Sequence, residues 1–239
     1  MNEFTIVIKS RTNVVKYNYE HSLHAFICTH ISNKCYGKSN KTFIHSNLME
    51  SNKRLEKPCG IWGRDGITFK SNPCFSIRTD DNEIIVSLIS NIKKGVAVFD
   101  DFIVSDYYYN NVENIADSDY FSTVYSSPIV ISSQYNTIKD KIPTDLYPSI
   151  EHYLENGVRK KALDKGITLG NFSIKIEKEY KPCDILTKKY DTNCVNKAYK
   201  EKGRNFKLKI EGDSDIKEFI WMYGIGRSNG LGCGYLFNK

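Results

Sequence analysis

Gly224-Ile-Gly-Arg-Ser-Asn-Gly-Leu-Gly-Cys-Gly234 is the stretch of the chain that says most about its fold. Five of these eleven residues are glycine, which adopts positive φ angles and allows close backbone approach. The preceding segment Phe219-Ile-Trp-Met222 is apolar, so we expect the loop to be fixed between buried elements. Its N–H groups and Arg227 are expected to form an anion-binding concavity. The spacing differs from dinucleotide-binding and P-loop patterns, which favours a long polyanion over a nucleotide cofactor.

Two further segments precede this loop in a characteristic order. They are Lys41-Thr-Phe-Ile-His-Ser-Asn-Leu48, which alternates like a strand, and Ser126-Ser-Pro-Ile-Val130 in the middle of the chain. Together with the Gly-x-Gly and Gly-x-Gly pairs, they resemble the motifs of the CRISPR-associated repeat-processing endoribonucleases, the sixth Cas family. The resemblance spans most of the chain. It implies tandem ferredoxin-like domains that bind CRISPR repeat RNA in precursor crRNA and cleave it without a metal, leaving a 2′,3′-cyclic phosphate.

The periodicity of the sequence agrees with that architecture. Strands are expected at 4–8, 41–48, 67–70, 75–78, 96–99 and 102–104, with helices at 20–32 and 83–92. This β-α-β-β-α-β order is the ferredoxin-like plan. A degraded copy follows, with strands at 125–132, 172–176 and 206–210, a helix at 148–164, and a short helix or apolar turn at 214–222. Residues 183–200 are ambiguous, with a loop as one interpretation. We therefore predict an α+β protein with tandem ferredoxin-like (RRM-like) domains at 1–118 and 119–239, the second carrying the glycine-rich loop.

Composition narrows the function classes. The 239 residues are 40% hydrophobic, and no apolar run is long enough to span a membrane. The seven cysteines are scattered, without the spacing of a zinc site, so we expect no metal or other cofactor, no disulfide framework and a cytoplasmic location. Net charge is +5 over residues 1–60, −5 over 61–150 and +7 over 151–210. Two basic blocks could form a groove for RNA, although charge alone favours the simpler alternative of a lysine-rich surface.

Metal-free RNA cleavage needs groups that deprotonate the 2′-hydroxyl, stabilise the phosphorane and protonate the leaving oxygen. The family's usual tyrosine falls at Cys28, and its usual histidine is absent, so only Lys41 matches residue for residue. Helical spacing places His24 on the face of Cys28, whereas alternation places His45 outward on the face of Lys41. His24 and His45 are therefore the leading catalytic candidates, with Tyr36 as a weaker one.

The RNA-binding candidates are the loop and clusters of basic side chains: Gly224, Gly226, Arg227, Gly230, Gly232, Gly234, Lys34, Lys38, Arg159, Lys160, Lys161 and Arg204. Each has a plainer reading as a structural or solvated residue. Two rival functions stay open: an inactive repeat-RNA-binding protein, and a structural subunit of a CRISPR effector complex. Such a complex, or a second copy of the chain, is a further partner consistent with the sequence.

Overall fold

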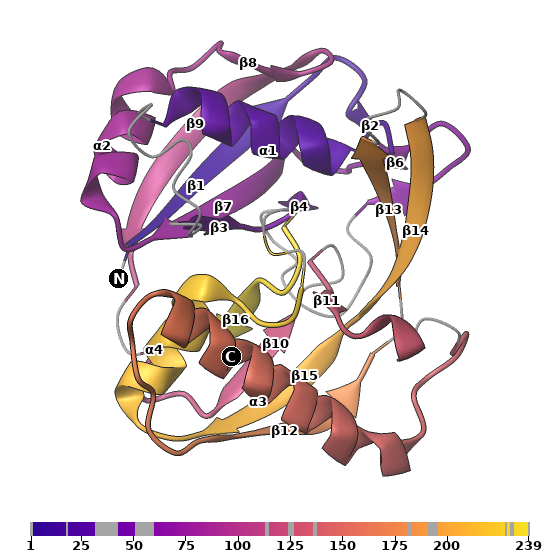
Figure 1. The fold of residues 1–239 in the computed structure, drawn as a ribbon. Helices are drawn as coiled ribbons and strands as arrows, with labels where there is room; N and C mark the ends of the chain where they lie inside the picture. The colour runs from indigo at the N-terminus through magenta and orange to yellow at the C-terminus, as the bar shows by residue number, and fades with distance from the viewer. Residues whose placement is uncertain are drawn as a thin grey trace.

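The computed structural model describes residues 2–17, 19–31, 43–50, 60–112, 115–123, 127–135, 138–180, 183–190, 196–227, 229 and 232–238. Two similar halves lie one above the other, each with helices across one face of an antiparallel sheet (Figure 1).

The first half follows the predicted β-α-β-β-α-β order. Its elements are β1 (Asn2–Lys9), α1 (Tyr19–His30), β3 (Phe43–His45), β7 (Pro73–Thr79), α2 (Asn82–Asn91) and β9 (Phe102–Asn111). The sheet order is β3-β7-β1-β9-β8, where β8 is Ala97–Phe99, and β4 (Met49–Glu50) also pairs with β7. A separate small sheet consists of three two-residue strands: β2 (Val14–Val15), β5 (Ile61–Trp62) and β6 (Ile67–Thr68). Asp81 caps α2 by accepting a hydrogen bond from the Glu83 N–H, as its position in the sequence predicts.

The second half repeats the same plan. Its elements are β10 (Tyr120–Thr123), α3 (Tyr147–Asp164), β12 (Ser173–Glu179), β15 (Phe206–Glu211), α4 (Ser214–Tyr223) and β16 (Leu236–Asn238). Short 3₁₀ helices at Ser133–Tyr135 and Thr144–Leu146 precede α3. The sheet order is β12-β15-β10-β16. Numbered within each half, both sheets have the order 2-3-1-4, which confirms the prediction of tandem ferredoxin-like folds.

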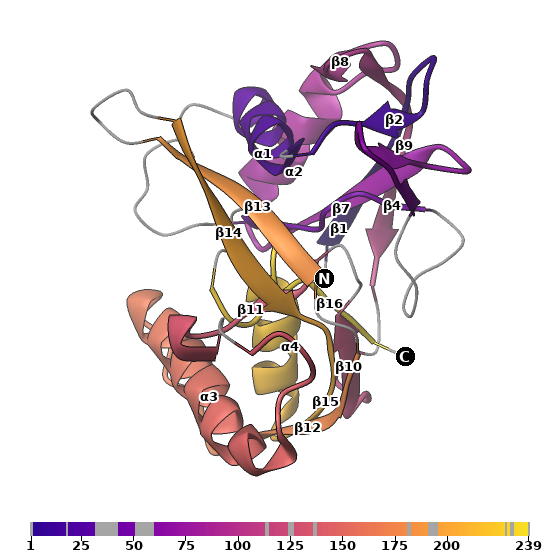
Figure 2. The ribbon, with the colours of Figure 1, turned by 90° about the vertical axis from the view of Figure 1, so that its right-hand side faces the viewer.

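A long hairpin occupies residues 183–204, where the sequence pattern was ambiguous and a loop was one interpretation. Strands β13 (Cys183–Tyr190) and β14 (Asn196–Arg204) pair along their whole length, from Cys183 with Gly203 to Tyr190 with Asn196. The hairpin is inserted between β12 and β15, and it rises from the second half to lie beside the first (Figures 1 and 2). At its base, β14 pairs with β11 (Ile129–Val130), which is all that the structure describes as strand in the segment predicted at 125–132.

Each half has its own apolar core, and Arg78 of β7 reaches from the first half to the carbonyls of Trp221 and Leu236 in the second. The first core gathers residues from Phe4 to Val104, and the second extends from Ile115 to Leu236. Phe237 of β16 and Tyr235, just before that strand, pack in the first core. The domain boundary at 118/119 itself stays a prediction. Within the described residues, no helix is long and apolar enough to cross a membrane.

Candidate functional site

The glycine-rich loop is fixed by backbone hydrogen bonds to the Ser127–Val130 segment. Gly234 N–H donates to the Pro128 carbonyl (2.9 Å), and Arg227 N–H donates to the Val130 carbonyl (2.9 Å). Within the loop, Ile225 N–H donates to the Gly234 carbonyl at 3.0 Å. The loop is thus held between buried elements, as its apolar flank predicts.

The strand segment around β3 joins the same region. Asn47 N–H donates to Ser127 Oγ at 2.8 Å. A Cβ atom placed on Gly232 would lie 2.2 Å from Asn47 Oδ1, and one placed on Gly224 would lie 2.9 Å from Ile44 Cδ1. The three motifs that are far apart in the sequence therefore meet at one place, where the two halves touch.

The predicted anion-binding concavity is wrong for three glycines of the loop. The N–H groups of Gly224, Gly232 and Gly234 donate inside the protein, to the carbonyls of Ile220, Asn229 and Pro128. These glycines instead leave room for close neighbours: a Cβ on Gly234 would lie 1.8 Å from the Ile225 carbonyl oxygen. Gly230 lies outside the described residues. Contact between RNA and the loop stays a prediction, for which the exposed Arg227 is the best-placed side chain.

Arg204 was expected to line a phosphate path, and the structure corrects this. Its side chain is 1% exposed and pairs with the buried Glu179 carboxylate at 3.0 Å. Its guanidinium also donates to the carbonyls of Asp140 (2.6 Å) and Ile138 (2.5 Å). Burial raises the pKa of Glu179, and Arg204 opposes that shift. Arg204 is therefore a structural residue of the second half.

The basic cluster on α3 divides into three environments. Arg159 lies over the ring of Phe172, 4.4 Å from its centre, and Lys160 is exposed. Lys161 is partly buried and donates to the Gly224 carbonyl at 2.9 Å and to Asn229 Oδ1 at 2.6 Å. Of the three, Lys161 thus contacts the glycine-rich loop directly.

The two leading histidines lie together, although one of them faces inward. The ring centres of His24 and His45 are 5.6 Å apart, and His24 also stacks near Phe43. His45 was predicted to face outward, yet its exposed fraction is 0%. Alternation along β3 is right, but both faces are covered: α1 lies on the side of His45, and the second half lies on the side of Ile44.

Hydrogen bonds orient both rings. His45 Nδ1 donates to the Ser46 carbonyl at 3.0 Å. His24 Nε2 lies 3.4 Å from Cys28 Sγ, one turn along α1, on the face that the spacing predicts. Lys41, Tyr36, Lys34 and Lys38 lie outside the described residues, so their roles stay predictions.

Glu20 is a titratable neighbour that the sequence reading passed over. It stands one helical turn before His24, a spacing that places both side chains on one face of α1. Its Oε2 atom is buried without a hydrogen-bond partner. Burial raises its pKa from the usual 4.5 to about 7, against a backbone hydrogen bond that lowers it. The i, i+4 spacing was the signal that could have found it.

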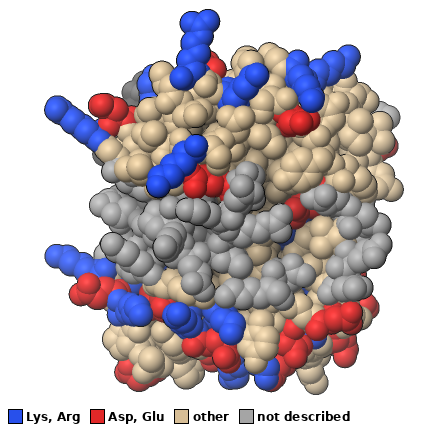
Figure 3. Space-filling model, turned by 180° about the vertical axis from the view of Figure 1, so that it is seen from behind, with Lys and Arg blue, Asp and Glu red and all other residues tan. Residues whose placement is uncertain are grey.

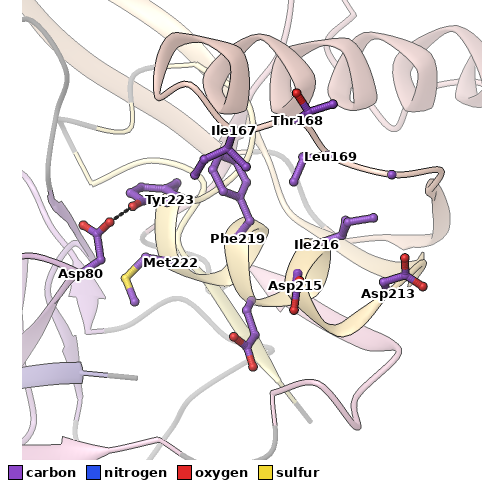
Figure 4. A pocket seen from close by; sticks show the side chains of 12 residues that line it. Asp80, Ile167, Thr168, Leu169, Asp213, Asp215, Ile216, Phe219, Met222 and Tyr223 are labelled. Carbon is purple, nitrogen blue, oxygen red and sulfur yellow. Dashed lines mark hydrogen bonds between the residues drawn. The ribbon is translucent and has the colours of Figure 1, made fainter.

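The pocket beside α4 has the wrong charge for RNA. Its volume is about 410 Å³, and its floor includes Phe219 and Met222 (Figure 4). Carboxylates of Asp80, Asp213 and Asp215 line it, and Tyr223 donates a hydrogen bond to Asp80. Phosphate groups would be repelled there, so the pocket is separate from the candidate RNA site.

The described surface neither confirms nor contradicts the predicted positive groove. Seen from behind, lysine and arginine on the lower half are mixed with aspartate and glutamate (Figure 3). Pairs such as Lys209 with Glu211 neutralise part of that charge. A continuous groove stays a prediction. Among the described residues, no group of three or more histidine, cysteine, aspartate or glutamate side chains is placed to hold a metal.

Comparisons with known proteins address the family and the fold. The family model described as CRISPR associated protein Cas6, C-terminal, matches residues 110–237. A Cas6-related protein from Pyrococcus furiosus has a TM-score of 0.72 at 21% identity, covering 100% of this chain and 98% of its own. A RAMP protein that binds different RNA substrates has a TM-score of 0.71 at 17% identity, and the match covers 100% of both chains. A CRISPR associated protein Cas6 has a TM-score of 0.67 at 19% identity, and the match covers 100% of this chain and 99% of the other. No curated protein matches the sequence. The structural likenesses confirm the tandem ferredoxin-like fold.

Proposed function

We propose that this protein, which belongs to the Cas6 family of CRISPR-associated proteins, binds the repeat RNA of precursor crRNA and cleaves it. The observation that carries the proposal is the meeting of the three motifs beside the His24–His45 pair. The glycine-rich loop, Ser127 and Asn47 are joined by hydrogen bonds or close contacts, and β3 links them to the histidines. A loop for RNA and two acid–base groups thus lie on either side of one short strand.

The chemistry uses the RNA's own nucleophile. A base removes the proton of the 2′-hydroxyl, the 2′-oxygen attacks the adjacent phosphorus, and the bond to the 5′-oxygen breaks as an acid protonates that oxygen. The products are a 2′,3′-cyclic phosphate and a free 5′-hydroxyl. An imidazole suits proton transfer at neutral pH because its usual pKa is about 6.5.

His24 is the histidine of the pair that we assign to proton transfer. Its side chain is partly exposed, whereas His45 is fully buried. His45 is then a positioning residue, since its ring contacts His24 and is itself fixed by the Ser46 carbonyl. By resemblance to the family, Lys41 would stabilise negative charge on the phosphate.

The burial of His45 also favours a second candidate function. If neither histidine reaches RNA, the same fold would bind the repeat without cutting it. This non-catalytic binder keeps the loop and Arg227 as the RNA contacts and assigns the histidines to packing. A structural subunit of an effector complex would share those contacts.

A single-turnover assay separates these functions. Labelled repeat RNA is incubated with the protein in EDTA, and wild type is compared with His24→Ala, His45→Ala and the control His152→Ala. His152 is exposed on α3 and bonds to Asn156, far along the chain from α1. We expect His24→Ala to lower the rate by about 10²–10⁴-fold with little change in affinity. His45→Ala should lower the rate and shift the pH–rate profile, and His152→Ala should do neither.

The outcomes distinguish the candidates. Tight binding without a cut supports the non-catalytic binder. Cleavage that requires Mg²⁺ contradicts the proposed chemistry, and cleavage at the wild-type rate by both variants contradicts the assigned site. If the protein does not bind repeat RNA at all, the proposed function is wrong.

A further inference from the structure

The amide of Asn229 lies at the centre of the glycine-rich loop, and each of its polar atoms has a partner. Its Nδ2 group donates to the carbonyls of Ile225 (3.1 Å) and Cys233 (2.8 Å). Its Oδ1 atom accepts the hydrogen bond from Lys161 Nζ at 2.6 Å. A primary amide has two N–H donors and one carbonyl acceptor, so the side chain joins both arms of the loop to α3.

Two of the loop's glycines make room for that amide. A Cβ atom on Gly234 would lie 2.8 Å from Asn229 Nδ2, and one on Gly224 would lie 3.0 Å from it. The same two positions approach opposing backbone, with contacts of 1.8 Å to the Ile225 oxygen and 2.8 Å to the Gly234 oxygen. The first and last glycines of the run are therefore explained by the path of the chain around Asn229.

Lys161 closes this arrangement from the helix side. Its ammonium also donates to the carbonyl of Gly224, the C-terminal cap of α4, at 2.9 Å. A cation at that end complements the partial negative charge of the helix terminus. The Lys161 side chain is partly buried and makes two hydrogen bonds to the loop, so its ammonium is directed at protein groups.

We propose that Lys161 and Asn229 are positioning residues, which hold the glycine-rich loop in the shape that presents Arg227 to RNA. This inference rests on the proposed function, and it replaces the expectation that Lys161 binds phosphate itself. Arg227 is the side chain that they serve: its backbone N–H bonds to the Val130 carbonyl, and its side chain is exposed. The Lys161–Asn229 pair stabilises the arms on either side of it.

Salt dependence separates a positioning lysine from a phosphate contact. Affinity for labelled repeat RNA is measured across a salt series for wild type, Lys161→Met, Asn229→Ala and Arg227→Ala. Loss of one phosphate contact lowers the slope of log K against log salt by about 1. We expect that loss for Arg227→Ala. Lys161→Met and Asn229→Ala should each weaken binding about tenfold or more, but adding either to Arg227→Ala should lower the slope no further, because the contact that they position is already lost. Lys175→Met, which removes an exposed lysine that is not among the RNA-binding candidates, is the control and should leave binding nearly intact.

Combining the two changes tests whether the residues act as one unit. The double variant Lys161→Met/Asn229→Ala should bind no more weakly than the weaker single variant, because both remove the same arrangement. Fully additive losses would contradict a shared role.

Hydrogen exchange tests the pair without RNA. The amide protons of Ile225 and Gly234 are bonded inside the loop region, and they should exchange faster in Lys161→Met, Asn229→Ala and Asn229→Asp. Asn229→Asp keeps an acceptor for Lys161 but loses both Nδ2 donors. It can therefore replace Lys161→Met or Asn229→Ala in this experiment if either of them folds poorly. The amide of Leu154, in the core of α3, is the internal reference and should not change.

These readouts fail in different ways. A slope lowered by about 1 in Lys161→Met, with unchanged exchange, would make Lys161 a phosphate contact and overturn the inference. Unchanged exchange in all three variants would also overturn it. If the wild-type protein binds no repeat RNA, the proposed function fails, and the exchange data alone decide whether the pair orders the loop.

Discussion

Replacing Arg78 with methionine should destabilise the protein by about 4 kcal/mol, because this side chain joins the two halves from a fully buried position. Arg78 lies in β7 and is 1% exposed. Its Nε donates to Glu3 at 2.9 Å, and Nη1 donates to the carbonyls of Trp221 (3.1 Å) and Leu236 (2.8 Å) in the second half. The guanidinium lies between the rings of Trp221 and Tyr235, 3.5 and 3.8 Å from their centres.

The magnitude follows from what the substitution leaves behind. Removing one partner of a buried ion pair costs about 3–5 kcal/mol, since the other charge loses its compensation. Each carbonyl without a partner adds about 1–3 kcal/mol, although such terms do not sum fully. Methionine retains apolar contact with both rings and offsets part of the loss. Because domains of ordinary stability unfold with about 5–15 kcal/mol, the variant should be marginal.

Urea denaturation at pH 7 measures the effect, followed by tryptophan fluorescence and far-ultraviolet circular dichroism. One of the two tryptophans, Trp221, stacks on Arg78 and reports directly on the contact. Arg159→Met is the control: this arginine also lies over a ring, but it is exposed, so we expect less than about 1 kcal/mol. Arg78→Lys keeps the charge without the fork and should fall between. A loss below about 1 kcal/mol in Arg78→Met would refute the reasoning.

Two further changes test single features of the fold. Glu20→Gln should make stability less dependent on pH: the folded protein holds a proton that the unfolded chain releases between pH 4.5 and about 7, so wild-type stability falls as pH rises through that range. Thermal melts at pH 4.5 and 8 should show a gain for Glu20→Gln at the higher pH only; equal shifts at both would contradict it. Gly234→Ala should destabilise by more than about 2 kcal/mol, because its φ is +69° and its Cβ would strike the Ile225 oxygen. Gly157→Ala, inside α3 with open space around it, should stabilise by about 0.5–1 kcal/mol in the same urea assay, and two equal effects would contradict the argument.

Most helices and long strands could be predicted because their signals are local. The ends of α1 follow from its apolar stripe, and those of α2 from its cap and the glycine after it. Both helices are predicted to within one or two residues of their observed ends. The hairpin of β13 and β14 could not, because its strands are largely polar and are specified by pairing with each other and with β11. A polar strand of that kind has no alternation to read.

The candidate site was predicted in its parts but not in its orientation. The sequence spacing predicts that His24 and Cys28 share one face of a helix, and the structure shows the two side chains in contact. The burial of His45 was not predicted, because the second half covers the face of Ile44 and α1 covers the opposite face, to which His45 points. Arg204 shows the same limit: its partner Glu179 stands 25 residues earlier and is brought close only by the pairing of β12 with β15.

The position of β3 explains why a strand motif and a glycine motif occur in the same chain. Adjacent residues of a strand point to opposite faces, so Ile44 is directed at Gly224 while His45 is directed at His24. A displacement of the glycine-rich loop would therefore push on Ile44 and, through the same three-residue strand, shift His45 against His24. If the protein binds and cleaves RNA as proposed, the two steps would be coupled by this geometry. Substitutions in the loop would then be felt at the histidines as well as at the RNA.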